Sequence, residues 1–512
     1  MNHLSLKFII MHFILIIVVI SVASLWLWYR WHDRRIIQIG LKLGSHKLSL
    51  ILGFWHIVTQ ATILKDLEDK SKKFGPNFIW YTGPYVEFIT IDPKIVKDIL
   101  TLKAPPNKGI EYNGFRHIFG EGLVTMPGDE WQPHRKLMDV AFKLPKIIEF
   151  IPIFHKKMTG FFAQLDKCHV MDNSNDILVF CREYTISVSG ETMLGRNLYK
   201  NKSLDLKLFA KQISGLLEYV SATLFNVVYQ TEHFLKIADK TIFKEARQTA
   251  DLMRSLIDGA YTYYATGLRN DPEYLVSQDI AVAKHIIDAI ESNELEKDLA
   301  ISSMMHLFIA SFETSSATLY FTILMLAMHP EYQAKVYAEI CKLFPDNDNG
   351  EFNISYEHTK QLTYLDMFIK ETMRLLPTIP MFGRISIEDN LKLSNDIVIP
   401  KGLRTLIDVY DLHRSKDIWG PQANKFNPDN FLPVNVEARH PYAFIPFSKG
   451  KRSCIGMRYA EIGLKVVMAK TIKRYKFSTT AKLEDLVVHN HLSLHLVNPP
   501  PLTIEKRIHL SG

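Results

Sequence analysis

The stretch Phe447–Gly456, FSKGKRSCIG, contains one of only four cysteines in a chain of 512 residues. It places that cysteine between two glycines and close to three cations. Gly450 permits a tight turn, and Gly456 permits a flat group to approach the backbone closely. From Ile455 onward the sequence IGMRYAEIGLKVVMAKTIKRY has helical periodicity. We therefore expect Cys454 at the positive end of a helix dipole, where a thiolate is favoured over a thiol.

A thiolate in such a loop suits one kind of chemistry, because sulfur can hold haem iron from one side and leave the opposite coordination position open. The alternative is a structural cysteine in a basic surface loop. However, the pattern Phe-x-x-Gly-x-Arg-x-Cys-x-Gly is satisfied at Phe447, Gly450, Arg452, Cys454 and Gly456. Here the chain resembles the cytochrome P450 family. The resemblance implies heme b, iron protoporphyrin IX, with an axial thiolate from Cys454 and with Phe447, Arg452 and Gly456 beside it.

Glu371 and Arg374 match the Glu-x-x-Arg pair of that family. A spacing of three residues places both side chains on one helix face, where they can form a charge-assisted pair. The family usually completes this network with an arginine in a Pro-Glu-Arg-Phe segment. This chain instead has Pro428-Asp429-Asn430-Phe431. We therefore expect Asn430 to form hydrogen bonds where a guanidinium normally lies.

Two haem propionates need cations, and the resemblance indicates where to look. Trp131 and Arg135, in GDEWQPHRK, match the Trp-x-x-x-Arg start of a family helix. Arg384, from PTIPMFGR, and Arg452 are the other candidates for pairing with the propionates. Taken singly, each arginine is as readily explained as a solvated surface cation, so the prediction depends on the set.

The stretch Phe308–Ala317, FIASFETSSA, resembles the oxygen-activating helix of the family. The resemblance implies that the Thr314 hydroxyl forms a hydrogen bond to bound oxygen and that Glu313 relays protons from solvent. Ser311 departs from the usual glycine, so it can narrow the oxygen groove or donate a hydroxyl to it. The alternative is an ordinary acid–alcohol pair, with Thr314 bonded to its own i−4 carbonyl.

The N-terminal run Phe8–Tyr29, FIIMHFILIIVVISVASLWLWY, has 22 residues and no formal charge. At a rise of 1.5 Å per residue it spans roughly 33 Å, enough for a hydrocarbon core. Tryptophans and Tyr29 mark its end, and Arg30, Arg34 and Arg35 follow, against Lys7 before it. This asymmetry predicts an uncleaved, single-pass anchor with the remaining chain in the cytosol. The resemblance to microsomal members of the family implies the endoplasmic reticulum membrane. A removed signal peptide and a buried core helix are the alternatives.

We expect two parts of the chain: residues 1–35 as anchor and basic flank, and residues 36–512 as a single haem-thiolate catalytic domain. Microsomal members of the family usually have a proline-rich hinge between these parts. The segment RRIIQIGLKLGSHKLS has none, which leaves open how rigidly the domain sits against the membrane. Segments such as DVYDLHRSKDIWG and RHPYAFIPFS resemble the insect and fatty-acid ω-hydroxylase branch of the family.

The predicted fold class is mainly α with a small mixed β-sheet region, the cytochrome P450 fold, preceded by the transmembrane helix. A Gly-Pro pair separates two β-rich segments, which predicts a hairpin, and Asp-Pro then opens a helix. Helical periodicity predicts helices near 130–143, 178–195, 205–225, 242–267, 281–288, 295–328, 330–343 and 361–376. Predicted strands are 77–82, 86–91, 384–386, 405–409, 492–496 and 502–505.

Composition and motifs narrow the partners. Four cysteines without a CxxC pair argue against a disulfide framework or a structural zinc site. A net charge of +7 is modest for this length and argues against a nucleic-acid binder. The chain has no Gly-rich nucleotide fingerprint after a strand, so we do not expect it to bind NADPH itself. The resemblance implies that electrons come from NADPH-cytochrome P450 reductase, with cytochrome b5 as a second candidate partner. The cations Lys449, Lys451 and Arg458 would steer such an acidic partner.

The leading function is a membrane-anchored monooxygenase that inserts one oxygen atom from O2 into an apolar small molecule, a lipid, hormone or xenobiotic. An isomerase or dehydratase of the same fold is the alternative within enzymes, and the Glu313-Thr314 pair argues against it. A haem-binding protein without catalysis and a single-pass adaptor without haem are the alternatives from other classes. Which substrate is used cannot be inferred from the fold.

Overall fold

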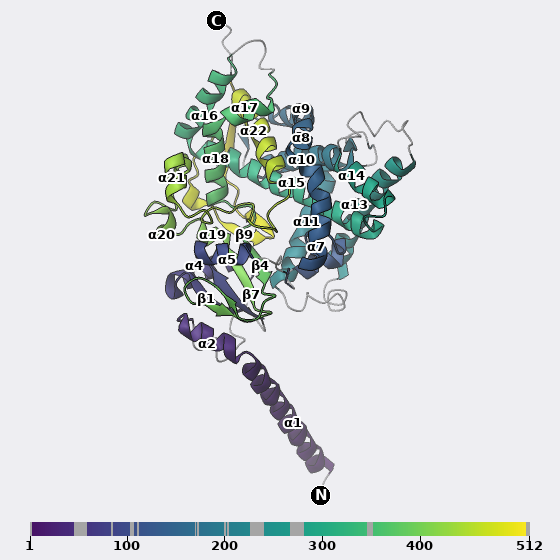
Figure 1. Ribbon diagram of the computed structural model, residues 1–512, viewed down its shortest axis with the longest axis vertical. Helices are drawn as coiled ribbons and strands as arrows, with labels where there is room; N and C mark the ends of the chain where they lie inside the picture. The colour runs from purple at the N-terminus through teal and green to yellow at the C-terminus, as the bar shows by residue number, and fades with distance from the viewer. Residues whose placement is uncertain are drawn as a thin grey trace.

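The longest described helix, α15 (Lys297–Met328), runs through the middle of the helical part of the chain (Figure 1). Most of its side chains are buried, and in its second half they are buried on nearly every face, so other parts of the protein surround this helix. It contacts α10, α13, α14, α16, α18 and α22. This central position allows residues in the middle of α15 to reach an interior cavity.

The computed structural model describes residues 3–45, 59–82, 85–102, 107–109, 112–168, 170–171, 174–198, 201, 204–225, 240–266, 281–345 and 352–507. Within these ranges the chain is mainly helical, with small sheets, as predicted. The other longer helices are α1 (His3–His32), α2 (Arg34–Lys42), α4 (Ile63–Phe74), α5 (Pro93–Leu100), α7 (Gly128–Asp139), α9 (Ile151–Leu165), α10 (Asn175–Leu194), α11 (Leu206–Phe225), α13 (Lys240–Thr266), α14 (Val282–Glu291), α16 (Pro330–Leu343), α18 (Thr363–Leu375) and α22 (Met457–Arg474).

Short helices complete the helical part. They are α6 (Asn113–Phe119), η2 (Val140–Phe142), α8 (Leu144–Glu149), α17 (Tyr356–Gln361), α19 (Val409–Leu412), α20 (Lys416–Trp419), η6 (Pro428–Phe431), α21 (Pro433–Ala438) and η7 (Leu483–Asp485). The predicted helices all occur, with ends shifted by a few residues. The prediction missed α9, whose buried face packs against α10 and α22.

The largest described sheet has the order β1-β2-β7-β4 and mixes antiparallel and parallel pairing. Its first two strands form the predicted hairpin, and Gly83 and Pro84 between them lie outside the described residues. Asp92 caps α5, accepting a hydrogen bond from the backbone N–H of Lys94 (2.9 Å). The strands are β1 (Asn77–Thr82), β2 (Tyr85–Thr90), β4 (Met381–Ile385) and β7 (Arg404–Asp408).

Three smaller described sheets pair β10 with β9, β3 with β11 and β8, and β5 with β6. The β9–β10 hairpin contacts α4, α11 and α15, so it lies against the same central helix as the cavity. Their strands are β3 (Val170–Met171), β5 (Leu391–Lys392), β6 (Val398–Ile399), β8 (Tyr475–Ser478), β9 (Val488–His491), β10 (Ser493–Leu496) and β11 (Leu502–Lys506).

At the N-terminus, α1 projects from the end of the molecule that carries α2 and the β1–β2 sheet (Figure 1). Its segment Met11–His32 is long and apolar enough to cross a membrane, with a mean hydropathy of 2.3. In place of a proline hinge, the basic flank forms α2, which packs on β1. Arg30 Nη1 donates to Tyr81 Oη (3.1 Å), and Tyr81 Oη donates to Asp33 Oδ2 (3.4 Å). These buried polar groups join the end of α1 to the sheet.

Candidate active site

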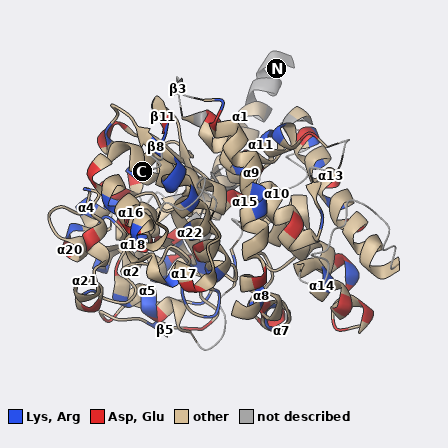
Figure 2. Cartoon of the chain, turned by 90° about the horizontal axis from the view of Figure 1, so that it is seen from above, with Lys and Arg blue, Asp and Glu red and all other residues tan. Residues whose placement is uncertain are grey.

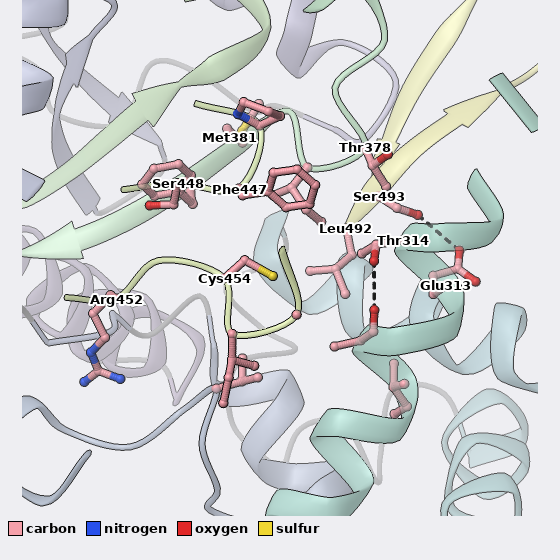
Figure 3. A pocket seen from close by; sticks show the side chains of 18 of the residues that line it. Glu313, Thr314, Thr378, Met381, Phe447, Ser448, Arg452, Cys454, Leu492 and Ser493 are labelled. Carbon is pink, nitrogen blue, oxygen red and sulfur yellow. Dashed lines mark hydrogen bonds between the residues drawn. The ribbon is translucent and has the colours of Figure 1, made fainter. Parts of the chain in front are cut away.

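A cavity of about 430 Å³ lies between α15, the Cys454 loop, β4 and the β9–β10 hairpin. This volume falls in the range of small-molecule sites, roughly 300–1,000 Å³. Its walls are mostly apolar, and they include the predicted Glu313, Thr314, Phe447, Cys454 and Gly456. Figure 3 shows the loop with Cys454 on one side of this cavity and α15 with Thr314 on the other.

Backbone geometry sets the position of Cys454. The backbone N–H of Cys454 donates to the carbonyl of Phe447 (2.9 Å), which closes the loop. Gly450 has φ +73°, and a Cβ there would lie 1.8 Å from the carbonyl oxygen of Leu100. A side chain at this position would therefore force the loop off the end of α5. Gly456 immediately precedes α22, so Cys454 lies just before a helix N-terminus, as predicted.

The charge state of Cys454 differs from the expectation. Its side chain is exposed only toward the cavity, with protein around it, and burial raises the pKa of the Cys454 thiol. A hydrogen bond from the Gly456 backbone and the charge of Arg135 lower this pKa, but burial outweighs them. The nearest cation in sequence, Arg452, points away from the sulfur (Figure 3). Without a metal, the site therefore favours the thiol.

Arg384 and Arg452 are both buried at the edge of the cavity. Burial and the nearby charge of Arg384 lower the pKa of Arg452 to about 9. Arg452 Nη2 donates to the carbonyl of Met126 (2.7 Å), whereas its buried Nε and Nη1 have no hydrogen-bond partner in the described chain. Two buried cations that repel each other and unsatisfied N–H groups call for an anion at this edge.

Trp131 and Arg135 do not line the cavity but support Arg452 and the loop from α7. The Arg452 guanidinium lies 4.2 Å from the centre of the buried Trp131 ring. Arg135 donates from Nη1 to the carbonyl of Ser453 (2.8 Å) and from Nε to Asp139 Oδ1 (2.7 Å). Stacking and hydrogen bonding therefore hold both the cation and the Cys454 loop against α7.

These residues fit an iron porphyrin. A sulfur faces an apolar cavity, glycine leaves room beside it, and unsatisfied guanidinium N–H groups lie at the edge, where propionates would need cations. Among the described residues, no cluster of three or more His, Cys, Asp and Glu side chains has a metal-binding arrangement. The described residues therefore present the single sulfur of Cys454 at this cavity rather than a cluster of metal-binding side chains.

On α15, Thr314 lies at the cavity wall and its Oγ1 donates to the carbonyl of Ala310 (2.8 Å). This is the i−4 bond of the alternative interpretation, so in this state the hydroxyl proton is directed to the backbone. The Ser311 hydroxyl lies within hydrogen-bond distance of the carbonyl of Phe308 (2.8 Å) and Ser189 Oγ (2.8 Å). Ser311 therefore ties α15 to α10, an arrangement that neither sequence alternative described.

Glu313 is buried beside Thr314 but is directed away from Cys454 (Figure 3). Its Oε1 accepts from Arg182 Nη2 (3.1 Å) and from Ser493 Oγ (3.2 Å). Its Oε2 is buried without a hydrogen-bond partner in the described chain. Arg182 and Ser493 were not predicted, because each is separated from Glu313 by more than a hundred residues and belongs to no local motif.

The predicted Glu371–Arg374 pair is bidentate, with two N–H···O distances of 2.7 Å, and both side chains are fully buried. Arg374 also donates to the carbonyls of His413 (2.8 Å) and Ala423 (2.6 Å). Asn430 Nδ2 donates to Glu371 Oε1 (3.1 Å), as expected for the residue that replaces the third cation. This network joins α18 to the loops that lead to the Cys454 segment.

Comparisons with known proteins agree with this geometry. A family model described as Cytochrome P450 matches residues 44–505. The chain is 32% identical over 491 residues to Probable cytochrome P450 313a4 of Drosophila melanogaster, covering 94% of this chain and 97% of that protein. It is 32% identical to Probable cytochrome P450 313a2 (96% and 99%) and 27% identical to Cytochrome P450 4c3 (82% and 80%), both of the same organism.

Proposed function

The chain belongs to the cytochrome P450 family of haem-thiolate monooxygenases, and on this premise we propose that it inserts oxygen into an apolar small molecule at the endoplasmic reticulum membrane. The proposal places haem iron on Cys454, anchor and basic flank in residues 1–35 and one catalytic domain in 36–512. A thiolate-ligated haem, when bound, would use two electrons to activate O2, a reaction that the side chains alone cannot carry out.

Three parts of the chain would hold the cofactor: the cysteine, the two buried arginines and the residues of α7 that support them. The Sγ of Cys454 would bind the iron, and the free Nε and Nη1 of Arg452 would donate to propionate oxygens together with Arg384. Trp131 and Arg135 keep these groups in place without touching the cavity. Because burial raises the pKa of the Cys454 thiol, Cys454 would give up its proton on binding iron.

In the proposed reaction, Thr314 and Glu313 on α15 deliver protons to the cavity. Thr314 Oγ1 would release the carbonyl of Ala310 and turn its hydrogen bond into the cavity. Glu313 would relay protons from solvent, since its Oε2 has no hydrogen-bond partner in the described chain while Oε1 accepts from Arg182 and Ser493. A proton-transfer group at such a place contributes about 10²–10⁴ in rate.

The shape and composition of the cavity support an apolar substrate. Its lining is dominated by aliphatic and aromatic side chains from α6, α11, α15 and the strands. These walls exclude water from the reaction and favour molecules with few polar groups. The apolar lining includes Phe115, Leu217, Ile309, Ile379, Met381, Phe382 and Leu492.

Two features support the proposed membrane anchor and the proposed partner-binding face: the N-terminal helix and the exposed cations near Cys454. The Met11–His32 helix supports membrane attachment, and Arg34 and Arg35 follow it on the side that we assign to the cytosol. Lys451 and Arg458 are exposed beside the Cys454 loop, where an acidic flavoprotein reductase, or cytochrome b5, would approach. In the view of Figure 2, basic and acidic residues are otherwise interspersed.

The observation that carries the proposal is a cysteine sulfur facing an apolar cavity opposite Thr314. The test is the absorption spectrum of the reduced, carbon-monoxide-bound protein. We expect the red-shifted Soret band of a thiolate ligand, lost in Cys454→Ser and retained in Cys341→Ser. Retention of that band in Cys454→Ser would overturn the assignment of the ligand. Turnover that needs neither NADPH nor reductase would instead indicate an isomerase or dehydratase.

A further inference from the structure

A second cavity, much smaller than the first, lies where α9, α10, α15 and α22 pack together (Figure 1). Its volume is about 30 Å³, which exceeds the roughly 10–15 Å³ that a single water molecule needs. Voids of this size are few in a close-packed protein interior. The space is therefore large enough to hold one small guest molecule.

Small side chains keep this cavity open. Ser311 and Ser315 line it from α15, and Ala460 and Gly463 line it from α22. A Cβ at Gly463 would lie 3.4 Å from Cζ of Phe154, the distance of an ordinary van der Waals contact. The helix would therefore accept alanine at this position, and alanine is the better helix former. Packing alone does not explain the glycine.

The walls of the small cavity favour an apolar guest over water, because most of their hydroxyl groups are already bonded to protein. Thr185 Oγ1 donates to a carbonyl of α10 (2.9 Å), and Tyr184 Oη donates to a carbonyl of α9 (3.3 Å). Tyr459 Oη lies 3.1 Å from a threonine hydroxyl of α10, and Ser311 is bonded to α10 as described above. That leaves Ser315, whereas a buried water typically makes about three hydrogen bonds.

The two cavities share a wall. Ser311, Ser315, Tyr459, Ala460 and Leu464 line both of them. A single layer of side chains therefore separates the cavities, and a change of rotamer at Leu464 or Ser315 would open a passage through it. A guest in the small cavity thus lies within one side chain of the space that a substrate would occupy.

We propose that the small cavity binds dioxygen and holds it beside the large cavity while an apolar substrate fills the latter. The proposal rests on the proposed function, because O2 is the small apolar molecule that a monooxygenase consumes. O2 has no net charge and is a poor hydrogen-bond acceptor, so a cavity with few free polar groups suits it better than it suits water. No bond forms or breaks at this site, which serves for docking.

The first test uses xenon, which is apolar, enters dry cavities and scatters X-rays strongly. Crystals of the full-length, haem-loaded protein are pressurised with xenon, and the electron density between the four helices is measured. We expect one xenon atom there. Gly463→Ala should lower its occupancy at least about threefold, since a methyl group takes up most of the space of one probe sphere. An ordered water at this place instead of xenon would overturn the proposal.

The second test asks whether a diatomic gas reaches the small cavity from the large one. Flash photolysis of the reduced, carbon-monoxide-bound protein releases the gas inside the chain. Molecules that enter the small cavity return later than those that stay in the large one, so we expect a slow geminate phase of rebinding. Both xenon pressure and Gly463→Ala should diminish that phase. If xenon binds and the slow phase keeps its share, the cavity is not on the path of the gas and the proposal is wrong.

Gly215→Ala is the matched control, because Gly215 is an exposed glycine of α11 whose added Cβ would meet nothing within 4 Å. It makes the same change in helix propensity and should alter neither measurement. Should Gly463→Ala not fold, Val188→Ile decides, since it adds a methylene group to the same cavity from α10.

The two tests also separate this inference from the function on which it rests. A carbon-monoxide complex without the Soret band of a thiolate ligand would refute the monooxygenase and, with it, the role of O2, even where xenon binds. A normal band together with an empty small cavity under xenon would refute the docking site and leave the monooxygenase standing.

Discussion

Asn430 donates its side-chain amide to Oε1 of Glu371 (3.1 Å), at the place where the family usually has a guanidinium. A cation is nevertheless close. Arg439 donates from Nη2 to the carbonyl of Asn430 (3.2 Å), and its guanidinium lies 3.8 Å from the centre of the Trp419 ring. Arg374 lies over the same ring at 4.8 Å. The indole therefore contacts two cations, and Arg439 partly compensates for the amide.

Removing this amide should destabilise the fold measurably. Asn430→Ala leaves Glu371 Oε1 with fewer donors in a buried place, which should cost about 1–3 kcal/mol. Arg374→Ala, which leaves the carboxylate uncompensated, should cost about 3–5 kcal/mol. Chemical unfolding of the haem-bound protein measures both. Asn435→Ala is the control, because Asn435 makes a similar side-chain bond (2.7 Å) while exposed. Equal losses at 430 and 435 would contradict the network.

Acid should weaken the fold through His413. This imidazole is fully buried, its Nε2 accepts from the backbone N–H of Ile445 (3.0 Å), and burial with two nearby arginines lowers its pKa to about 3. Below pH about 6.5 the imidazole of His413 is protonated in the unfolded chain but stays neutral in the folded chain. The stabilisation is complete above that pH and falls by about 1.4 kcal/mol per unit toward pH about 3.

The measurement is the slope of the unfolding free energy against pH. His413→Gln should flatten it by one proton in that window. Asp411, whose pKa burial raises to about 6, acts with the opposite sign at acidic pH in both proteins, so the difference between the two curves isolates the histidine. Parallel curves would show that folding does not lower the pKa of His413.

Haem retention should depend on the two buried arginines at the cavity edge. Arg452→Ala removes the unpartnered Nε and Nη1 groups, and we expect haem to transfer to apomyoglobin about ten- to hundredfold faster, as for the loss of a hydrogen bond to a charged group. Arg384→Ala should act in the same direction. Lys451→Ala, on an exposed side chain of the same loop, is the control. Unchanged retention in both arginine variants would exclude propionate binding at this edge.

Thr314 should govern how much peroxide leaks during turnover. Thr314→Ala removes the hydroxyl that we expect to turn into the cavity. The share of NADPH electrons released as hydrogen peroxide should then rise severalfold, which is less than the rate effect of about 10²-fold typical of a proton-transfer group. Thr314→Ser should retain most coupling. Thr322→Ala is the matched control, since Thr322 makes the same i−4 bond (2.7 Å to Thr318) on the same helix and is fully buried. A similar leak from both alanine variants would point to a backbone effect.

The junction with the anchor should loosen when Tyr81 loses its hydroxyl. Burial raises the pKa of Tyr81 to about 12, so the group stays a donor to Asp33 while accepting from Arg30. Tyr81→Phe removes one hydrogen bond from each of Arg30 and Asp33, and this loss should lower the free energy of unfolding by about 1–3 kcal/mol. Limited trypsin digestion in membranes should then cut faster after Arg34 and Arg35. Cleavage elsewhere in the domain should keep its rate, and an unaltered junction would argue against this docking.

Local chemistry made part of this molecule predictable. The Cys454 loop and the Glu371–Arg374 pair each act over a few residues, so short patterns together with the family resemblance indicated them. The contacts of Glu313 depend on how α10, α15 and β10 lie together, and no local pattern encodes that register. The charge state of Cys454 was mispredicted for a related reason: neighbours in sequence suggested a thiolate, whereas burial by distant segments favours the thiol.

The central helix α15 has a consequence for biosynthesis. It is apolar enough to qualify as a membrane span, with a mean hydropathy of 1.3, although 78% of its most apolar window is buried in the folded domain. While the ribosome is still at the translocon, its burial partners from α16 onward have not yet been made. An ionised side chain near the centre of an inserting helix costs about 3 kcal/mol. Glu313 would thus also help to keep the nascent chain out of the lipid, which makes a carboxylate there useful before any cofactor is loaded.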